Sequence, residues 1–255
     1  MLSVIVPSIR PGNLRRLYES IVAAYSGEFE FIVVSPNAPD SFFYDKPHIV
    51  YIPDMGSPVR AQQIGVNHAT GDYVLWGVAD DGIFRPGSID IAMKQAAGDT
   101  VVVGKYFEGT DNPAMSERPY YYINTHDCCR SKLIQDDWLM FMIGIIGRPL
   151  LWAVGGVDAT RFETLPMAFN DMSARLYRGG AKFVLMDEVM FRCSHLPGHE
   201  GAHGPVHDGQ TLHDEPQFRE IYNDPACATR VQIPLGNWRE APERWERRFG
   251  KAKTA

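Results

Sequence analysis

The chain has 255 residues, which is enough for one large α/β domain with a sizeable buried core. It carries 25 Lys and Arg against 31 Asp and Glu, and the formal charge of −6 offers no general attraction to nucleic acid or to an anionic membrane. No stretch approaches the roughly 18 consecutive apolar residues of a transmembrane helix. We therefore expect a cytoplasmic protein, at most peripheral to a membrane, with no nucleic-acid partner and no transmembrane segment.

Short apolar strands alternate with amphipathic helices in the first hundred residues. Strands are expected at residues 2–6, 29–34, 48–52, 73–78 and 101–103. Helices are expected at residues 13–24, 57–69 and 88–97, with Asn13 and Ser57 as caps and Pro58 at the first helical position. This alternation predicts a parallel sheet with helices on its faces.

The second half of the chain gives weaker signals. Residues 104–135 mix Gly, Pro and Asn with aromatics, which indicates loop with one or two strands. A short helix is expected to end at Gly155-Gly156, a further helix to run from a cap at Asn170 to Arg178, and a strand to follow at residues 182–186. Residues 195–216 are too rich in Gly, Pro and His for regular structure, and the tail from Arg239 is a candidate amphipathic helix.

The acidic pair Asp80-Asp81 directly follows a predicted buried strand. Open α/β sheets bind their ligands at the carboxyl ends of such strands. Gly82 favours a turn, so that one carboxylate could bind a sugar hydroxyl and the other a hard cation such as Mg²⁺ or Mn²⁺. An ordinary Asp-Asp-Gly turn with no ligand is the alternative interpretation.

Two separated stretches carry a family resemblance. The run from Gly71 to Asp81, preceded by a helix with Arg60 and Asn67, resembles the nucleotide-sugar core of family-2 glycosyltransferases with the GT-A fold, and residues 3–8 look like the first strand of that family. The continuation to Pro86 is similar to a variant of spore-coat-type members. The resemblance implies an α/β GT-A (Rossmann-like) fold, with a mostly parallel central sheet and helices on both faces. It also implies transfer from a UDP- or GDP-sugar to a glycan, a lipid-linked acceptor or another hydroxyl acceptor.

The same resemblance assigns roles to individual residues. Pro7, Ser8 and Arg10 would line the base and ribose pocket, Arg60 would approach the nucleotide, Asp80 would contact ribose or metal, and Asp81 would hold Mn²⁺ or Mg²⁺. Two positions depart from the family pattern. Ser35 follows the second strand where members commonly have an acid that contacts uracil or ribose, and Val78 stands at the first position of the usual D-x-D.

A further partial match lies in the second half. Residues 155–158 look like the family's G-G-F-D step, and residues 171–176 are similar to the end of its E-D-x-D-L-x-x-R-L pattern. An acceptor hydroxyl is a weak nucleophile, so a carboxylate must take its proton. Asp171 is the predicted general base of a single inverting displacement, and Glu163 is the second candidate. A carboxylate that only stabilises the start of a helix is the alternative for Asp171.

Four histidines recur every four residues at positions 195, 199, 203 and 207. The Pro and Gly residues between them exclude a helix, so the segment is expected to be a loop. One interpretation is a loop that closes over donor and metal, with His195 as a metal ligand. A solvated polar loop is the other.

The functional alternatives follow from what the motifs lack. The altered acidic motifs keep open a catalytically inactive nucleotide-binding protein with the same fold. The glycine-rich loops of nucleotidyltransferases and of dinucleotide-dependent oxidoreductases are absent after the first strand. Within one domain we assign residues 1–104 to the nucleotide-sugar-binding half, 105–235 to the acceptor-binding and catalytic half, and 236–255 to a C-terminal basic tail.

Overall fold

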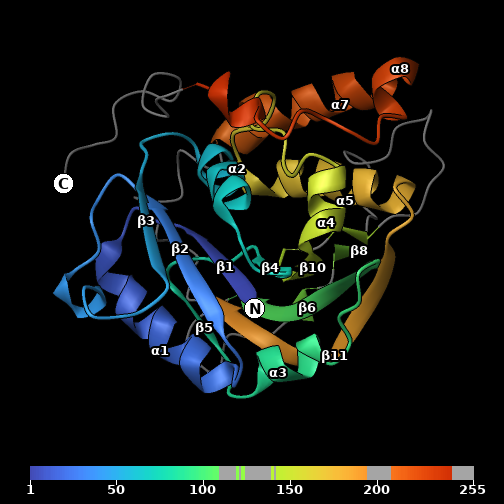
Figure 1. Cartoon of the computed structure of the whole chain (residues 1–255). Coiled ribbons are helices and arrows are strands. Elements are labelled where there is room, and N and C mark those ends of the chain that lie inside the picture. The colour runs from blue at the N-terminus through green and yellow to red at the C-terminus, as the bar shows by residue number, and fades with distance from the viewer. Residues whose placement is uncertain (109–118, 121, 124–138, 141, 194–207, 243–255) are drawn as a thin grey trace.

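The computed structural model describes residues 1–108, 119–120, 122–123, 139–140, 142–193 and 208–242. Within them, nine strands form one sheet in the order β3-β2-β1-β4-β10-β6-β11-β5, with β7 paired to β6 (Figure 1). The strands of the sheet are β1 (Leu2–Pro7), β2 (Phe29–Ser35), β3 (Ile49–Pro53), β4 (Tyr73–Trp76), β5 (Gly82–Phe84), β6 (Thr100–Glu108), β7 (Pro119–Tyr120), β10 (Gly144–Gly147) and β11 (Lys182–Cys193). The strands β8 (Tyr122–Ile123) and β9 (Leu139–Met140) form a separate pair.

Four of the eight neighbouring strand pairs in the described sheet run parallel, and they include all the pairs among β1 to β4 that the sequence predicts. The strand β1 pairs parallel with β2 and β4, β2 pairs parallel with β3, and β6 pairs parallel with β11. The strand β10 comes from the second half of the chain and runs antiparallel between β4 and β6. The short strands β5 and β7 are also antiparallel to their partners. The sheet is therefore completed only by residues from both halves.

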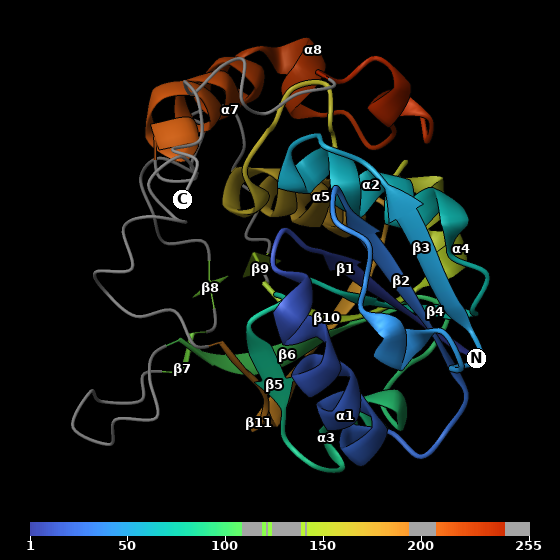
Figure 2. The same cartoon turned by 90° about the vertical axis from the view of Figure 1, so that its left-hand side faces the viewer.

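Helices cover both faces of the sheet (Figures 1 and 2). One face packs against α1 (Leu14–Ala24) and α3 (Ser88–Met93). The other packs against α2 (Pro58–His68), α4 (Arg148–Ala153) and α5 (Leu165–Arg178), with α7 (Glu215–Asn223) and α8 (Pro225–Ala228) beyond them. Because successive strand residues point to opposite faces, β1, β2, β4, β6 and β10 each contribute to both hydrophobic clusters.

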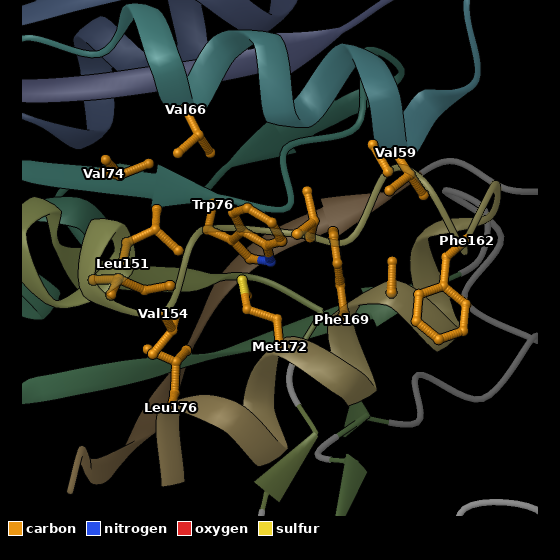
Figure 3. Close-up of a cluster of buried hydrophobic side chains, with 14 of the residues drawn as sticks. Val59, Val66, Val74, Trp76, Leu151, Val154, Phe162, Phe169, Met172 and Leu176 are labelled. Carbon is orange, nitrogen blue, oxygen red and sulfur yellow. The ribbon is translucent and has the colours of Figure 1, made fainter. Parts of the chain in front are cut away.

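The core above β4 is centred on Trp76 (Figure 3). Its ring lies 4.5 Å from the ring of Phe169 on α5, and Val66 of α2 and Val74 of β4 belong to the same cluster. Burying these large apolar side chains stabilises the fold by about 1.5–3 kcal/mol each. The last residue of β4 is thus firmly anchored just before the turn that carries the acidic pair.

Two predicted elements of the second half begin elsewhere. The helix α5 begins at Leu165, with Thr164 as N-cap and Pro166 in the first turn, so the predicted start at Asn170 is wrong. Proline is favoured at the start of a helix because it lacks the N–H that would lie unpaired there. Because α5 begins at Leu165, Asp171 lies in the middle of this helix. In addition, residues 208–214 are helical and lead directly into α7, where the sequence predicts an irregular loop.

The start of α2 matches its prediction. The Ser57 hydroxyl accepts a hydrogen bond from the Arg60 N–H at 3.1 Å, and Pro58 takes the first helical position. Asn13 precedes α1, but its side chain makes no cap hydrogen bond. Within the part of the chain that the structure describes, no helix has both the length and the apolar character of a membrane span.

Candidate nucleotide-sugar site

The candidate site lies beyond the carboxyl ends of β1 and β4, which are neighbours in the middle of the sheet. From β1 the chain continues to β2 on one side and later returns to β4 on the other. Such a reversal of strand order opens a crevice where α/β sheets bind ligands. Ser8 and Arg10 follow β1, and Asp80 and Asp81 follow β4. The topology therefore brings together residues that are about 70 positions apart in sequence.

The carboxylate of Asp80 joins the two loops. Its Oδ2 accepts from the Ser8 hydroxyl at 2.9 Å and from the Arg10 backbone N–H at 3.2 Å, and its Oδ1 accepts from Arg10 Nη2 at 2.5 Å. Asp80 and Ser8 are buried, whereas the Arg10 side chain is 36% exposed. Both carboxylate oxygens of Asp80 thus bind donors from the loop after β1.

Asp81 lies on the same turn and contacts the same arginine. Gly82 N–H donates to the Ala79 carbonyl at 3.1 Å, which closes the turn expected at this position. Arg10 Nη1 lies 3.4 Å from Asp81 Oδ2, and Arg16 Nη2 of α1 donates to the Asp81 carbonyl oxygen at 2.7 Å. One guanidinium therefore contacts both members of the acidic pair.

Gly77 sets the direction in which the chain leaves β4. Its φ of 77° lies in the left-handed region, and a Cβ added there would overlap the Met142 carbonyl oxygen. Only glycine satisfies both conditions without a shift of the neighbouring backbone. The position of the acidic pair therefore depends on this residue.

The other predicted nucleotide contacts flank this centre. Pro7 ends β1 opposite Val34 of β2. The buried Ser35 hydroxyl accepts from the Asn37 N–H at 3.0 Å, and Asn37 Nδ2 donates to the Ile9 carbonyl at 3.2 Å. The loops after β1 and β2 are thus linked beside the acidic pair, and Ser35 makes a contact within its own loop.

Arg60 makes contacts within the protein. Its Nε donates to both Asp54 carboxylate oxygens at 3.0 and 3.2 Å, and its Nη1 donates to the Trp238 and Ala241 carbonyls at 2.5 and 3.3 Å. The guanidinium also lies over the Trp238 ring, 5.4 Å from its centroid. The structure therefore places Arg60 as a link between α2 and the first residues of the C-terminal tail.

Asp171 is fully buried among cationic and hydroxyl donors. Arg175 Nε donates to Oδ2 at 2.8 Å, and Arg230 Nη2 and the Tyr222 hydroxyl donate to Oδ1 at 2.6 and 3.0 Å. Burial raises the pKa of Asp171, and the Arg175 guanidinium opposes that change. Burial and the adjacent Asp171 charge raise the pKa of Tyr222 well above its ordinary value, which keeps its hydroxyl protonated as a donor. A general base must contact the acceptor, so this placement favours a structural role for Asp171.

The same network joins the two motifs of the second half. Arg175 also donates to the carbonyls of Val154 and Gly156 at 2.6 and 2.7 Å, on either side of Gly155. Gly155 and Gly156 both have left-handed φ values, 83° and 71°. Arg175 belongs to the sequence motif. Its hydrogen bonds to the carbonyls on either side of Gly155 can be recognised only in the folded structure.

A second arginine connects the network to the C-terminal part of the chain. Arg230 Nη1 lies 3.0 Å from Asp158 Oδ2, while its Nη2 binds Asp171. Neither Arg230 nor Tyr222 belongs to a recognisable sequence motif, so the sequence does not predict their contacts with Asp171. The one sequence signal for these partners is Asp171 itself, because a carboxylate that becomes buried needs cationic partners from other parts of the chain.

Glu163, the second candidate base, precedes α5 and is buried. Its backbone N–H donates to the Asp214 carboxylate at 3.1 and 3.2 Å, and the Thr164 N–H donates there at 2.6 Å. Burial raises the pKa of Asp214, against the opposing effect of these donors. Asp214 therefore fixes the backbone that carries Glu163.

The predicted metal ligands fit a divalent cation poorly in this arrangement. Mg²⁺ would need carboxylate oxygens at about 2.0–2.1 Å. Asp80 instead binds Ser8 and Arg10, and the Arg10 guanidinium adjoins Asp81. Among the described residues no three His, Cys, Asp or Glu side chains gather as a metal site, and His195 lies outside those residues.

The comparisons with known proteins concern the fold. No protein-family model and no curated protein matches the chain. Among solved structures, S. aureus TarS 1-349 matches with a TM-score of 0.53 and 17% identity over 76% of this chain and 60% of that one. Its complex with UDP matches with a TM-score of 0.52 and 17% identity, over 80% of this chain and 63% of that one.

A second protein has the same overall architecture. The mannosyltransferase PcManGT from Pyrobaculum calidifontis, in complex with GDP-Man and Mn²⁺, matches with a TM-score of 0.50 and 16% identity. The match covers 90% of this chain and 69% of that one. The chain has the GT-A fold, as predicted, and it spans about 60% of the length of TarS 1-349.

Proposed function

We propose that this protein transfers a glycosyl group from a nucleotide diphosphate sugar to a hydroxyl acceptor. The observation that carries the proposal is the contact of Ser8 and Arg10 with Asp80. It places polar and charged side chains from two loops at the reversal of strand order, where this class of sheet binds its ligand. The GT-A architecture and the complexes of its structural neighbours with UDP and GDP-Man support a sugar nucleotide as that ligand.

The reaction requires charge stabilisation at the donor. As the glycosidic bond to the diphosphate breaks, negative charge grows on the leaving phosphate, and a fixed cation next to it lowers the barrier. Arg10 has a planar fork of N–H donors that matches a phosphate group. Asp80 and Ser8 hold that fork at the edge of the sheet. A divalent cation bound by Asp80 and Asp81 is the other possible source of charge, and it would require Arg10 to move.

The reaction also requires a base for the acceptor hydroxyl. A single displacement with one base inverts the anomeric carbon. Asp171 and Glu163 are the two carboxylates that the sequence suggests. The three donors around Asp171 favour Glu163, because both carboxylate oxygens of Asp171 already accept hydrogen bonds from groups of the protein itself.

Nucleotide binding and turnover together test the proposal. Thermal unfolding with UDP, GDP and a panel of their sugars should show stabilisation by the right donor, by about 2.7 kcal/mol at a hundredfold excess over Kd. Release of the nucleoside diphosphate from that donor measures hydrolysis or transfer. The Asp80→Asn variant should lose both effects.

Asp72→Asn is the matched control for Asp80→Asn. Asp72 precedes β4 and its side chain is exposed, whereas Asp80 follows the same strand and is buried in the candidate site. The control should keep nucleotide binding and turnover. If no uridine or guanosine nucleotide stabilises the wild type, the proposal is overturned.

A catalytically inactive nucleotide-binding protein is the second candidate. The Asp80 contacts with Arg10 and the buried state of Asp171 favour it, because both acids are engaged within the protein. Stabilisation by a nucleotide without any release from its sugar conjugates, across the whole panel, would support this candidate over the transferase.

A further inference from the structure

We infer that Arg10 is the cation of the acidic pair, and that the protein binds the donor diphosphate through this arginine without a divalent metal ion. The inference rests on the proposed function, since it names the group that receives the diphosphate. It differs from the metal site that the sequence resemblance implies. It follows from the contacts of four residues: Ser8, Arg10, Asp80 and Asp81.

The Arg10 guanidinium occupies the volume in which a bridging metal ion would bind. Arg10 Nη2 lies 2.5 Å from Asp80 Oδ1, and Nη1 of the same guanidinium lies 3.4 Å from Asp81 Oδ2. A cation that bridged the two carboxylates would have to enter the volume next to both of these oxygens. The guanidinium already lies there, and its positive charge repels a second cation at this distance.

Arg10 is held in place by hydrogen bonds from both its backbone and its side chain. Its backbone N–H donates to both Asp80 Oδ2 and the Ser8 hydroxyl, each at 3.2 Å, and Ser8 donates to the same Oδ2 at 2.9 Å. The backbone and the side chain of Arg10 thus bind one buried carboxylate. Movement of the guanidinium alone would leave that carboxylate without its charged partner, which is costly for a buried acid.

Two arginines lie next to the acidic pair Asp80-Asp81. Val78 replaces the first acid of the usual D-x-D, so the turn supplies two carboxylates in direct succession. Arg10 contacts both side chains, and Arg16 binds the Asp81 carbonyl. Among the described residues, Arg10 and Arg16 thus bring two positive charges to the two acids before any metal binds.

Arg10 is more accessible to a ligand than the two carboxylates that it contacts. The Arg10 side chain is 36% exposed, whereas the carboxylates beneath it are almost fully buried. An incoming diphosphate at this edge therefore meets the guanidinium before it meets either acid. A planar guanidinium forms paired hydrogen bonds with phosphate oxygens, and the acids behind it hold its orientation.

Titration calorimetry with UDP and GDP tests the inference, with each nucleotide measured in EDTA and again with Mn²⁺. The wild type should bind one of the nucleotides with the same affinity in both conditions. Arg10→Ala should lose about tenfold to a hundredfold in affinity in EDTA, because it removes a charge-assisted contact with the phosphates. In that variant Mn²⁺ should restore binding, since the two acids are left without their arginine.

A second measurement needs no nucleotide. The spectrum of free Mn²⁺, followed by electron paramagnetic resonance during titration with protein, reports binding of the metal itself. The wild type should leave the signal unchanged, and Arg10→Ala should reduce it. Arg10→Lys should keep the cation but lose the paired geometry, so it should bind nucleotide more weakly than the wild type and still exclude Mn²⁺.

The controls separate folding from binding. Arg15→Ala removes a neighbouring exposed arginine that pairs with Glu19 and lies over the Phe42 ring, and it should bind nucleotide and Mn²⁺ like the wild type. Melting temperatures of all variants identify any that fail to fold. Nucleotide binding by the wild type only when Mn²⁺ is present overturns the inference and leaves the proposed function standing. Absence of nucleotide binding under every condition overturns both.

Discussion

Individual carboxylates of this protein have very different surroundings, although the sequence makes them look alike. Asp80 accepts hydrogen bonds beyond the carboxyl ends of β1 and β4, and its partner Arg10 is partly exposed to solvent. Asp171 is enclosed by Arg175, Arg230 and Tyr222. The first environment is suited to a ligand, and the second is suited to holding α5 against the C-terminal part of the chain.

The Asp171→Asn variant should lose stability. The change leaves the buried Arg175 and the partly exposed Arg230 without their shared anion, and loss of one partner of a buried ion pair costs about 3–5 kcal/mol. Urea denaturation of the folded variant measures this loss. Glu19→Gln removes an exposed pair on α1 and should change stability by less than about 1 kcal/mol. An Asp171→Asn variant with wild-type stability and no transfer would instead support Asp171 as the base.

Gly77→Ala should disturb the acidic pair from a distance. The added Cβ meets the Met142 backbone in addition to the unfavourable φ, so we expect a loss well above the roughly 1–2 kcal/mol of the φ alone, together with weaker nucleotide binding. Gly87→Ala is the matched control, because its φ is 72° but nothing lies within 4 Å of the added carbon. Equal losses of stability in the two variants would contradict the steric explanation.

At the scale of whole elements, the sequence predicted best where local signals determine the structure. Ser57 and Pro58 mark the start of α2, and the apolar runs mark the first four strands. The start of α5 was misplaced because Asn170 looked like a cap, while the true signal was Thr164 followed by Pro166. Asp214, which binds the backbone at that start, comes from about 50 residues later, and no local pattern reveals it.

Two potential caps provide a test of this local physics. Ser57→Ala removes the hydrogen bond to the Arg60 N–H and should cost about 1 kcal/mol of stability. Asn13→Ala, at the start of α1, should cost less because that side chain makes no cap hydrogen bond. Chemical denaturation of both variants provides the comparison, and a larger loss for Asn13→Ala would contradict the structure.

At the scale of the whole molecule, the sequence predicted the fold class and the edge of the sheet where the candidate site lies. The contact between Arg10 and Asp80 could not be predicted from spacing, because it depends on β1 and β4 becoming neighbours. The insertion of β10 between β4 and β6 was also missed. The four residues of β10 are glycine and isoleucine, and hydrophobicity alone does not reveal which strands such a segment will join.

The insertion of β10 predicts how fragments behave. A fragment of residues 1–104 contains β4 and the start of β6 but lacks the strand that lies between them. The unpaired edges of β4 and β6 expose backbone groups, so the fragment should aggregate or remain partly unfolded. Circular dichroism during heating should show no cooperative transition for the fragment and one for the full chain. A sharp transition for the fragment alone would contradict this expectation.

The position of β10 also bears on synthesis. A ribosome makes the chain from its amino terminus, and the strands on either side of the gap emerge long before residues 144–147. Closure of the sheet must wait for that late segment, because no earlier strand of the structure pairs with both neighbours. During this interval the nascent chain presents the unpaired edges of β4 and β6, and chaperones that shield such edges should have their greatest effect on its yield.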